Sequence, residues 1–247
     1  MFSLDQESQA NMSTDEPQES AFDSLPIADP LAGLPETARE LLFAAQRVIA
    51  KDGLDKLTLA RLGEESGQNA ALVAYYFGNK MGLLERVVES IIHDECLETT
   101  NRIRNLPEGP RLSTISSELK HWSGEGEAYT AFFDLLVYSL RHDSMRQRMV
   151  QMYRWYIALN AEMLEVSEAE DPEKRRLLRG VAQLLSAISD GMAIQALIGP
   201  DVFPLDEAYD ALEFLLEHAL PEPLGRENSS SDDLAPGIEP SAEGVLG

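Results

Sequence analysis

The chain has 247 residues, of which 44% are hydrophobic and 26% are charged, the composition of a globular protein that can bury its own core. Its one cysteine, Cys96, excludes an internal disulfide framework and Cys-x-x-Cys metal or redox sites. The sequence has no uninterrupted apolar run as long as a membrane span and no secretory signal at its N-terminus. We therefore expect a cytoplasmic protein without a membrane partner.

The net charge of −23 is distributed unevenly along the chain. Residues 1–33 contain seven acidic residues and no basic ones, whereas residues 34–83 contain six of each. Nucleic-acid-binding proteins usually present a basic surface, so the total charge argues against a nucleic-acid partner. That objection is weakest for the neutral segment.

Two acidic, polar segments at the ends of the chain, residues 1–33 and 221–247, are predicted to be disordered tails. The second is also rich in proline, glycine and serine. Such tails keep an acidic protein in solution or take part in its regulation. The folded part is therefore expected between residues 34 and 220.

Between these tails the apolar residues recur at helical spacing, and no segment shows the alternation of a β-strand. The fold class that follows is all-α with about nine helices, divided into an N-terminal three-helix domain at 34–84 and a helical bundle at 85–220. The first helix contains the apolar set Leu41, Leu42, Ala45, Val48 and Ile49. Later helices are expected to start near residue 80 and to occupy 111–122, 128–141, 144–166, 174–198 and 205–220.

Two short helices joined by a glycine turn are predicted within residues 58–77. Thr58 is placed to cap the first of them, which ends at Gly67, and Asn69 is placed to cap the second. This arrangement is a helix-turn-helix, whose second helix enters the major groove of DNA. The sequence therefore predicts a DNA-binding unit in its neutral segment.

The face of the second helix that would meet DNA has small side chains, which favours deep insertion: Ala70, Ala71 and Ala74. Asn69, at the start of this helix, can reach a base edge or a phosphate. The helix lacks arginine, the commonest reader of guanine, so specificity rests on Gln68, Asn69 and alanine contacts with thymine methyl groups, or on DNA shape.

This segment resembles the DNA-binding domain of the tetracycline-repressor (TetR) family of transcriptional regulators. The resemblance is carried by Thr58, Gly67 and the run Tyr75-Tyr76-Phe77-Gly78-Asn79-Lys80-x-x-Leu83-Leu84.

The resemblance implies that Thr58, Tyr75 and Lys80 contact the DNA backbone, while Tyr76 either joins them or packs inside the domain. Lys80 also adds its charge to the positive end of the fourth helix, a favourable place for a phosphate. Gln68 stands where the family usually has an apolar turn residue, which leaves it able to face DNA.

The resemblance also implies that residues 85–220 bind a small-molecule effector and form a homodimer. A local signature, Ser189 to Leu197, is similar to the Asp-Gly-x-Ala-x-Gln-x-Leu pattern of the family's penultimate helix. The apolar residues of the last two helices are expected either to bury against a second copy or to form intramolecular core. The dimer candidates are Leu184, Leu185, Ile188, Leu212, Leu215 and Leu216.

A ligand site is expected around the helix at 128–141, which is apolar on all sides except at Asp134. One hypothesis is a hydrophobic or cationic effector with Asp134 as its counter-ion; the alternative is ordinary core, with Asp134 tied to Arg141 or another internal donor. The candidate ligand residues are Trp122, Phe133, Asp134, Tyr138, Met152, Trp155 and Tyr156. The sequence does not identify the effector.

Two other classes of protein were weighed. An enzyme is disfavoured, because the four histidines are scattered and no nucleotide-binding loop or nucleophile motif is present; no catalytic, metal or cofactor site is expected. An acidic, all-helical adaptor that binds proteins and no DNA would explain the charge but not the aromatic-lysine run. The predicted function is a sequence-specific DNA-binding transcriptional regulator. It is expected to be a repressor that binds operator DNA and is released from it by a small-molecule effector.

Overall fold

The computed structural model describes residues 20, 21, 23–105, 114, 115, 118, 120 and 126–219. In that part of the chain there are eight α-helices, two short 3₁₀ turns and no strands, which confirms the all-α class. Most of the helix predicted at 111–122, including Trp122, lies outside the described residues, as do residues 1–19 and 220–247.

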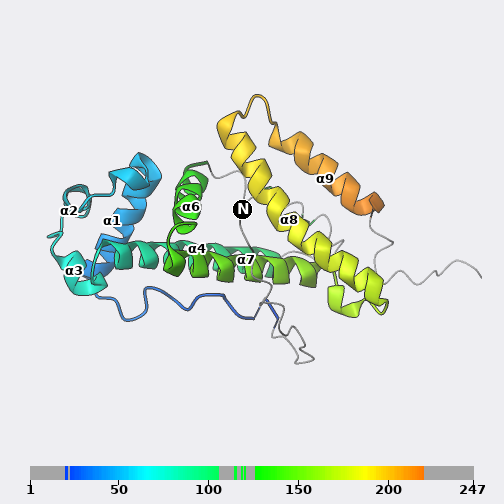
Figure 1. The fold of residues 1–247 in the computed structure, drawn as a ribbon, viewed down its shortest axis with the longest axis horizontal. Coiled ribbons are helices and arrows are strands. Elements are labelled where there is room, and N and C mark those ends of the chain that lie inside the picture. The colour runs from blue at the N-terminus through cyan, green and yellow to red at the C-terminus, as the bar shows by residue number, and fades with distance from the viewer. Residues whose placement is uncertain are drawn as a thin grey trace, which may run out of the picture.

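The N-terminal unit, here named the head, lies on the left in Figure 1. It is formed by α1 (Glu36–Asp52), the 3₁₀ turn η1 (Leu54–Lys56), α2 (Leu59–Ser66), α3 (Leu72–Phe77) and the first turns of α4 (Lys80–Arg104). The predicted apolar side of α1 is buried in full: Leu41, Leu42, Ala45, Val48 and Ile49. Leu62 of α2 and Val73 of α3 bury against it, so the head has an aliphatic interior that is continuous with the core of the rest of the molecule.

Of the caps predicted for the head, Thr58 and Gly67 are present as expected, and Asn79 forms a further cap that was not predicted. Thr58 Oγ1 accepts a hydrogen bond from the Arg61 amide at 3.1 Å, and Gly67 ends α2 in the left-handed conformation at φ 64°. Asn79 Oδ1 accepts from the Gly82 amide at 3.0 Å, which starts α4 at Lys80. These local bonds fix where each short helix begins and ends.

α3 begins two residues later than the sequence predicted. Residues 70 and 71 form a tighter turn, in which the amides of Leu72 and Val73 donate to the carbonyls of Asn69 and Ala70. Asn69 still caps this turn, because its side chain accepts from the Ala71 amide at 2.9 Å.

The connection from α3 to α4 depends on a glycine. A Cβ atom at position 82 would lie 2.0 Å from the Phe77 carbonyl oxygen, so only glycine permits the end of α3 to pack against the first turn of α4. This close approach places Tyr75, Tyr76 and Lys80 on one small structural unit.

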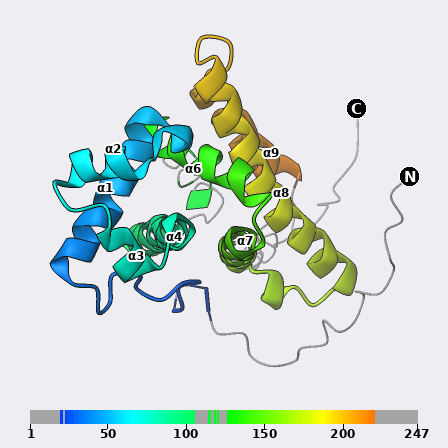
Figure 2. The same cartoon turned by 60° about the vertical axis from the view of Figure 1, so that its left-hand side comes forward.

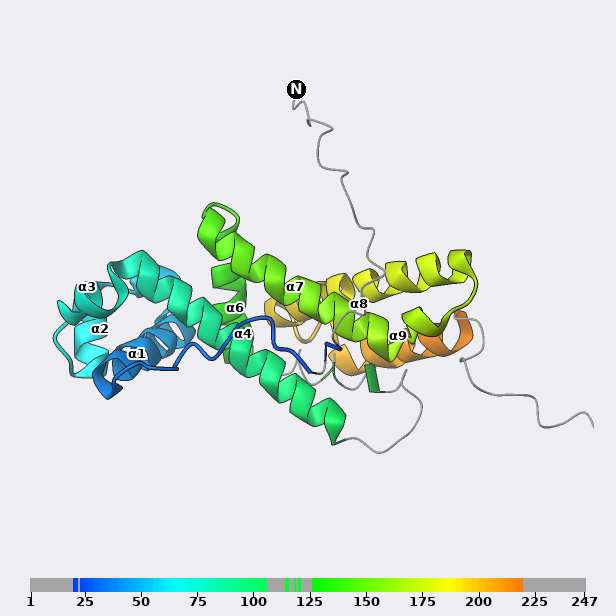
Figure 3. The same ribbon diagram turned by 90° about the horizontal axis from the view of Figure 1, so that it is seen from below.

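α4 extends out of the head towards the middle of the molecule (Figures 1 and 3), and Figure 2 views it nearly end-on. The second unit is here named the effector domain, after the ligand binding that the resemblance implies. It contains the rest of α4 together with α6 (Gly126–Ser139), α7 (Asp143–Met163), η2 (Val166–Glu168), α8 (Pro172–Ile198) and α9 (Leu205–Ala219). α7 is held against α4 by Arg148, whose guanidinium binds Glu89 at 2.7 Å and Glu85 at 3.3 Å. The head and the effector domain therefore share α4 as a common element.

The segment before α1 differs from the prediction of a disordered tail over residues 1–33. Residues 20, 21 and 23–34, here named the strap, run alongside α4 and α7 (Figure 3). Leu25, Ile27 and Leu31 pack on the core. Prolines at 26, 30 and 35 restrict the backbone between these apolar residues, so ordering the segment costs less entropy than its polar composition suggested.

Candidate functional site

The predicted DNA-contacting residues lie on the outside of the head. Thr58, Asn69, Ala71, Ala74, Tyr75 and Lys80 are exposed, while Gln68, Ala70 and Tyr76 are half-buried. Among the aromatic side chains that the structure describes, that of Tyr75 is the most exposed, with 79% of its surface free, and its ring packs edge-on against Tyr76. Because Val73 is buried beneath them, α3 presents its polar and small residues outward and is able to enter a groove.

Ion pairs in the head join residues of α1 and α2, and none of those described includes a residue of α3. Arg47 binds Glu40 at 2.7 Å and Glu65 at 3.0 Å, and Arg61 binds Asp52 at 2.9 Å. The hydrogen bond from Arg47, together with Arg61, holds the pKa of Glu65 below its usual value. Within the described residues Lys80 has no ion pair, so its ammonium group is available at the start of α4.

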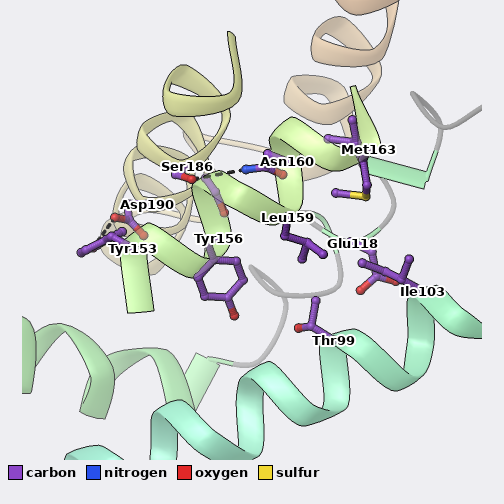
Figure 4. A pocket seen from close by; sticks show the side chains of 12 residues that line it. Thr99, Ile103, Glu118, Tyr153, Tyr156, Leu159, Asn160, Met163, Ser186 and Asp190 are labelled. Atoms are coloured by element: carbon purple, nitrogen blue, oxygen red, sulfur yellow. Dashed lines mark hydrogen bonds between the residues drawn. The ribbon is translucent and has the colours of Figure 1, made fainter. Parts of the chain in front are cut away.

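A small cavity lies in the effector domain, between the C-terminal part of α4 and helices α7 and α8 (Figure 4). Its volume of about 40 Å³ is room for about three water molecules. The walls combine aliphatic side chains with hydroxyl, amide and carboxylate groups. Its lining residues are Thr99, Ile103, Ile115, Glu118, Tyr153, Tyr156, Leu159, Asn160, Met163, Ser186, Ser189 and Asp190.

Two carboxylates line this cavity, each with a partner. The Tyr153 hydroxyl donates to Asp190 at 2.6 Å, and Arg102 of α4 donates to Glu118 at 2.9 Å. Burial raises the pKa of Asp190, and the bond from Tyr153 opposes that shift. Burial also raises the pKa of Tyr153, so the phenol remains the proton donor in this pair.

Hydroxyl and amide groups complete the polar part of the wall. Asn160 donates to Ser186 Oγ at 3.3 Å, a bond drawn in Figure 4. Ser189 Oγ is buried and has no hydrogen-bond partner among the described residues, although it lines the cavity. A buried hydroxyl without a partner is uncommon, because the lost bond to water is not replaced. Ser189 is thus a ready hydrogen-bonding group for a molecule inside the cavity.

Of the described residues predicted to bind ligand, Tyr156 alone lines this cavity. Asp134 is elsewhere: it is exposed at the junction with the head, where it accepts a hydrogen bond from the Leu54 amide at 3.2 Å. Tyr138 stacks on His142 in the same region. The other predicted residues, Phe133, Met152 and Trp155, pack in the core.

The sequence reading missed the cavity residues on α4 and α8. Asp190 lies in the local signature from Ser189 to Leu197, and a buried acid in a mostly apolar helix needs a partner such as Tyr153. Cys96 is fully buried, and burial raises the pKa of its thiol. A thiol of that kind is not a nucleophile.

The predicted dimer residues divide into two groups. Leu185, Leu212 and Leu216 are buried within the single chain, so for these the intramolecular alternative is correct. Leu184 and Leu215 are 60% and 58% exposed, and Ile188 is half-buried. Other exposed apolar side chains on these two helices were not predicted: Leu177, Ile194, Leu197, Ile198 and Phe214.

By length and composition alone, α8 is apolar enough to cross a membrane, with a mean hydropathy of 1.4 in its most apolar window. The sequence analysis did not anticipate this. Only 33% of that window is buried in the single chain, although the helix packs on α7 and α9. An apolar helix with an uncovered face needs a further partner surface.

Two family profiles match the chain. Residues 41–87 match bacterial regulatory proteins of the tetR family, and residues 111–221 match the C-terminal domain of BetI-type transcriptional repressors. With a matching helix-turn-helix head and a matching helical C-terminal domain, the chain belongs to the TetR family of DNA-binding transcriptional regulators. Within that family, its C-terminal residues are similar to those of BetI-type repressors.

Individual relatives agree with this assignment. The HTH-type transcriptional regulator BetI of Vibrio vulnificus is 23% identical over 197 residues, which cover 77% of this chain and 96% of the relative. BetI of Escherichia coli is 27% identical over 176 residues, 68% of this chain and 85% of the relative.

Solved structures share the fold. A regulator from Saccharomonospora viridis, determined in complex with choline, has a TM-score of 0.63 at 20% identity and covers 74% of this chain and 96% of its own. The multidrug binding protein EbrR, complexed with imidazole, has a TM-score of 0.57 at 20% identity, covering 78% of this chain and 100% of its own.

Proposed function

We propose that this chain is a homodimeric repressor that binds operator DNA through α3 and its flanking residues and is released by a small organic cation. The observation that carries the DNA part is the outward face of α3, with Asn69, Ala71, Ala74 and Tyr75 exposed above the buried Val73. Thr58, Tyr75 and Lys80 supply contacts to phosphates, and Gln68 and Asn69 supply contacts to bases.

Thr58 is suited to this role because its two hydrogen-bonding functions are separable. Its oxygen accepts from the Arg61 amide, which caps α2, while its hydroxyl hydrogen remains able to donate to a phosphate. Lys80 combines its ammonium charge with the free amides at the start of α4, which stabilises an anion at the same place.

The exposed apolar residues of α8 and α9, led by Leu184, Leu215 and Phe214, support dimerisation through these two helices. Burying them against the same residues of a second copy would make a four-helix interface with twofold symmetry. Two heads would then read two half-sites about 34–36 Å apart.

The cavity chemistry supports a cationic effector. Tyr153 and Tyr156 offer aromatic rings, and Asp190, which has no cationic partner among the described residues, offers negative charge; together they stabilise an ammonium group removed from water. Ser189 adds a hydroxyl partner for a polar substituent. Choline, which the Saccharomonospora viridis regulator holds, has both an ammonium and a hydroxyl group and is the first compound to test.

The experiment is a binding titration of the purified chain against duplexes that it selects from a random library. We expect enrichment of a twofold-symmetric sequence, binding that weakens steeply with salt, and release by choline at a concentration that saturates the protein. A library that shows no enrichment at low salt would favour the protein-binding adaptor instead.

A further inference from the structure

The strap connects the head with the effector domain by a route that does not use α4. It precedes both regions that match the family profiles, so the family assignment gives it no role. Leu34, at its end, is followed directly by Pro35, which caps α1. The strap is thus covalently part of the head, and its earlier residues lie on the effector domain, as Figure 3 shows.

The N-terminal end of the strap is bound to two side chains of α7. Glu162 uses both carboxylate oxygens, accepting from the Ser20 hydroxyl at 2.6 Å and from the Ala21 amide at 3.0 Å. The indole N–H of Trp155 donates to the Ala21 carbonyl at 2.9 Å and to the Ser24 carbonyl at 3.0 Å. Trp155 is only 6% exposed, so these bonds are largely shielded from water.

Further contacts hold the strap along its length. Arg104, at the end of α4, pairs with Asp23 at 3.0 Å. In the head, Arg39 of α1 donates to the Leu31 carbonyl at 3.3 Å, and Leu31 itself packs on the core. The pair with Asp23 is exposed and therefore weak, whereas the buried bonds of Trp155 supply the main attachment.

α7 has the strap on one side and the cavity on the other. Trp155, which binds the strap, packs edge-on against Tyr156 with ring centroids 5.0 Å apart, and Tyr156 lines the cavity. Glu162, the second anchor, is next to Met163, which also lines the cavity. Contact is therefore continuous from the cavity through Tyr156 and Trp155 to the strap.

We propose that the strap transmits occupancy of the cavity to the DNA-binding head, with Trp155 as its positioning residue. A cavity of about 40 Å³ has room for about three waters, so an effector with the seven heavy atoms of choline must displace its walls, including Tyr156 on α7. A strap stiffened by prolines 26 and 30 either follows α7 and shifts α1 or loses its bonds to Trp155. Both responses alter the position of the head.

Two measurements test this inference: the effect of choline on operator affinity, which rests on the proposed cationic effector, and amide hydrogen exchange, which does not. Operator affinity is measured with and without choline for four proteins: the full chain, a chain lacking residues 1–19, a chain lacking residues 1–33, and Trp155→Phe. For the full chain and the shorter deletion, which retains the strap, we expect choline to weaken operator binding by about tenfold. For the longer deletion and for Trp155→Phe, we expect the ratio of operator affinities measured without and with choline to fall towards one.

A double-mutant cycle separates transmission from simple loss of packing. If Trp155 acts through the strap, Trp155→Phe changes nothing further once residues 1–33 are removed. Thermal unfolding checks that both variants fold cooperatively. An unchanged choline ratio in a folded chain that lacks residues 1–33 would overturn the proposal.

The second readout needs neither DNA nor choline. Amide hydrogen exchange in α1 and η1 is compared between the two deletions, and we expect exchange about tenfold faster when the strap is absent, because the head is then held by fewer contacts. If choline has no effect on the full chain, the proposed effector class is wrong and exchange alone decides. Equal exchange in the two deletions would then refute the strap's role.

Discussion

The head and the effector domain use polar side chains in opposite ways. In the head, charged residues pair on the surface, as Arg47 does with Glu65, around an aliphatic core. In the effector domain, Asn160, Ser189 and Asp190 are in the interior, around a cavity. The one buried polar side chain described in the head, Ser66, is satisfied within its own helix by the Leu62 carbonyl, whereas the cavity wall keeps Ser189 without a hydrogen-bond partner among the described residues and so able to bind a ligand.

The largest expected effect comes from the surface that joins two effector domains. Leu184→Glu combined with Leu215→Glu would place four charges in the proposed dimer interface and produce monomers. Losing the second head lowers operator affinity by about a hundredfold or more, because the two half-sites are no longer bound together. Sedimentation and DNA titration measure both properties.

The matched control for this pair is Leu140→Glu, since Leu140 is equally exposed, at 65%, but lies outside α8 and α9. It should remain dimeric and bind the operator normally. A double variant that stays dimeric would show that this surface has another function.

A change in the head should affect DNA and leave the ligand untouched. Lys80→Ala removes one proposed phosphate contact, so operator affinity should fall by roughly tenfold and the salt dependence should decrease by about one unit of slope. Choline affinity should not change. Lys174→Ala, at the start of α8, removes an equal charge far from α3 and should leave the salt slope as it was.

A change in the cavity should do the reverse. Asp190→Asn removes a negative charge from the wall, and we expect choline affinity to fall by about tenfold with the operator affinity of the ligand-free protein unchanged. Calorimetry measures the first effect. Asp201→Asn, in the exposed turn after α8, is the control of equal charge.

The same carboxylate should make choline binding depend on pH. Because burial raises the pKa of Asp190, the folded chain binds its proton more tightly than the unfolded chain does. The resulting stabilisation is complete below the ordinary aspartate pKa and is lost as the pH rises through the raised value. Choline prefers the charged form, so its affinity should fall as the pH is lowered, and Asp190→Asn should flatten this profile.

The smallest effect concerns the boundary between the two regions. Asp134→Ala removes the hydrogen bond to the Leu54 amide and should cost no more than about 1 kcal/mol of unfolding free energy, because the site is exposed. Urea unfolding measures this change. Choline affinity should be unaffected. A large loss of choline affinity would show that Asp134 is the counter-ion of the effector.

The sequence determined the head almost completely. Its signals are local: Thr58 caps the helix that follows it, Gly67 ends that helix, and the helical period of α1 identifies its buried side. Local bonds of this kind depend on residues only three or four positions apart, so they are visible in a linear sequence. The error of two residues at the start of α3 arose where a tight turn replaced the first helical turn.

The cavity, the dimer surface and the strap were decided by tertiary structure. Leu184 and Leu185 are neighbours in sequence with the same side chain, yet one is exposed and the other buried, because the packing of α8 on α7 and α9 selects between them. Asp134 and Asp190 are each flanked by apolar residues within their helices, and only the arrangement of the helices directs one to the head and the other to the cavity. The strap binds side chains more than 130 positions away, a distance at which no sequence period operates.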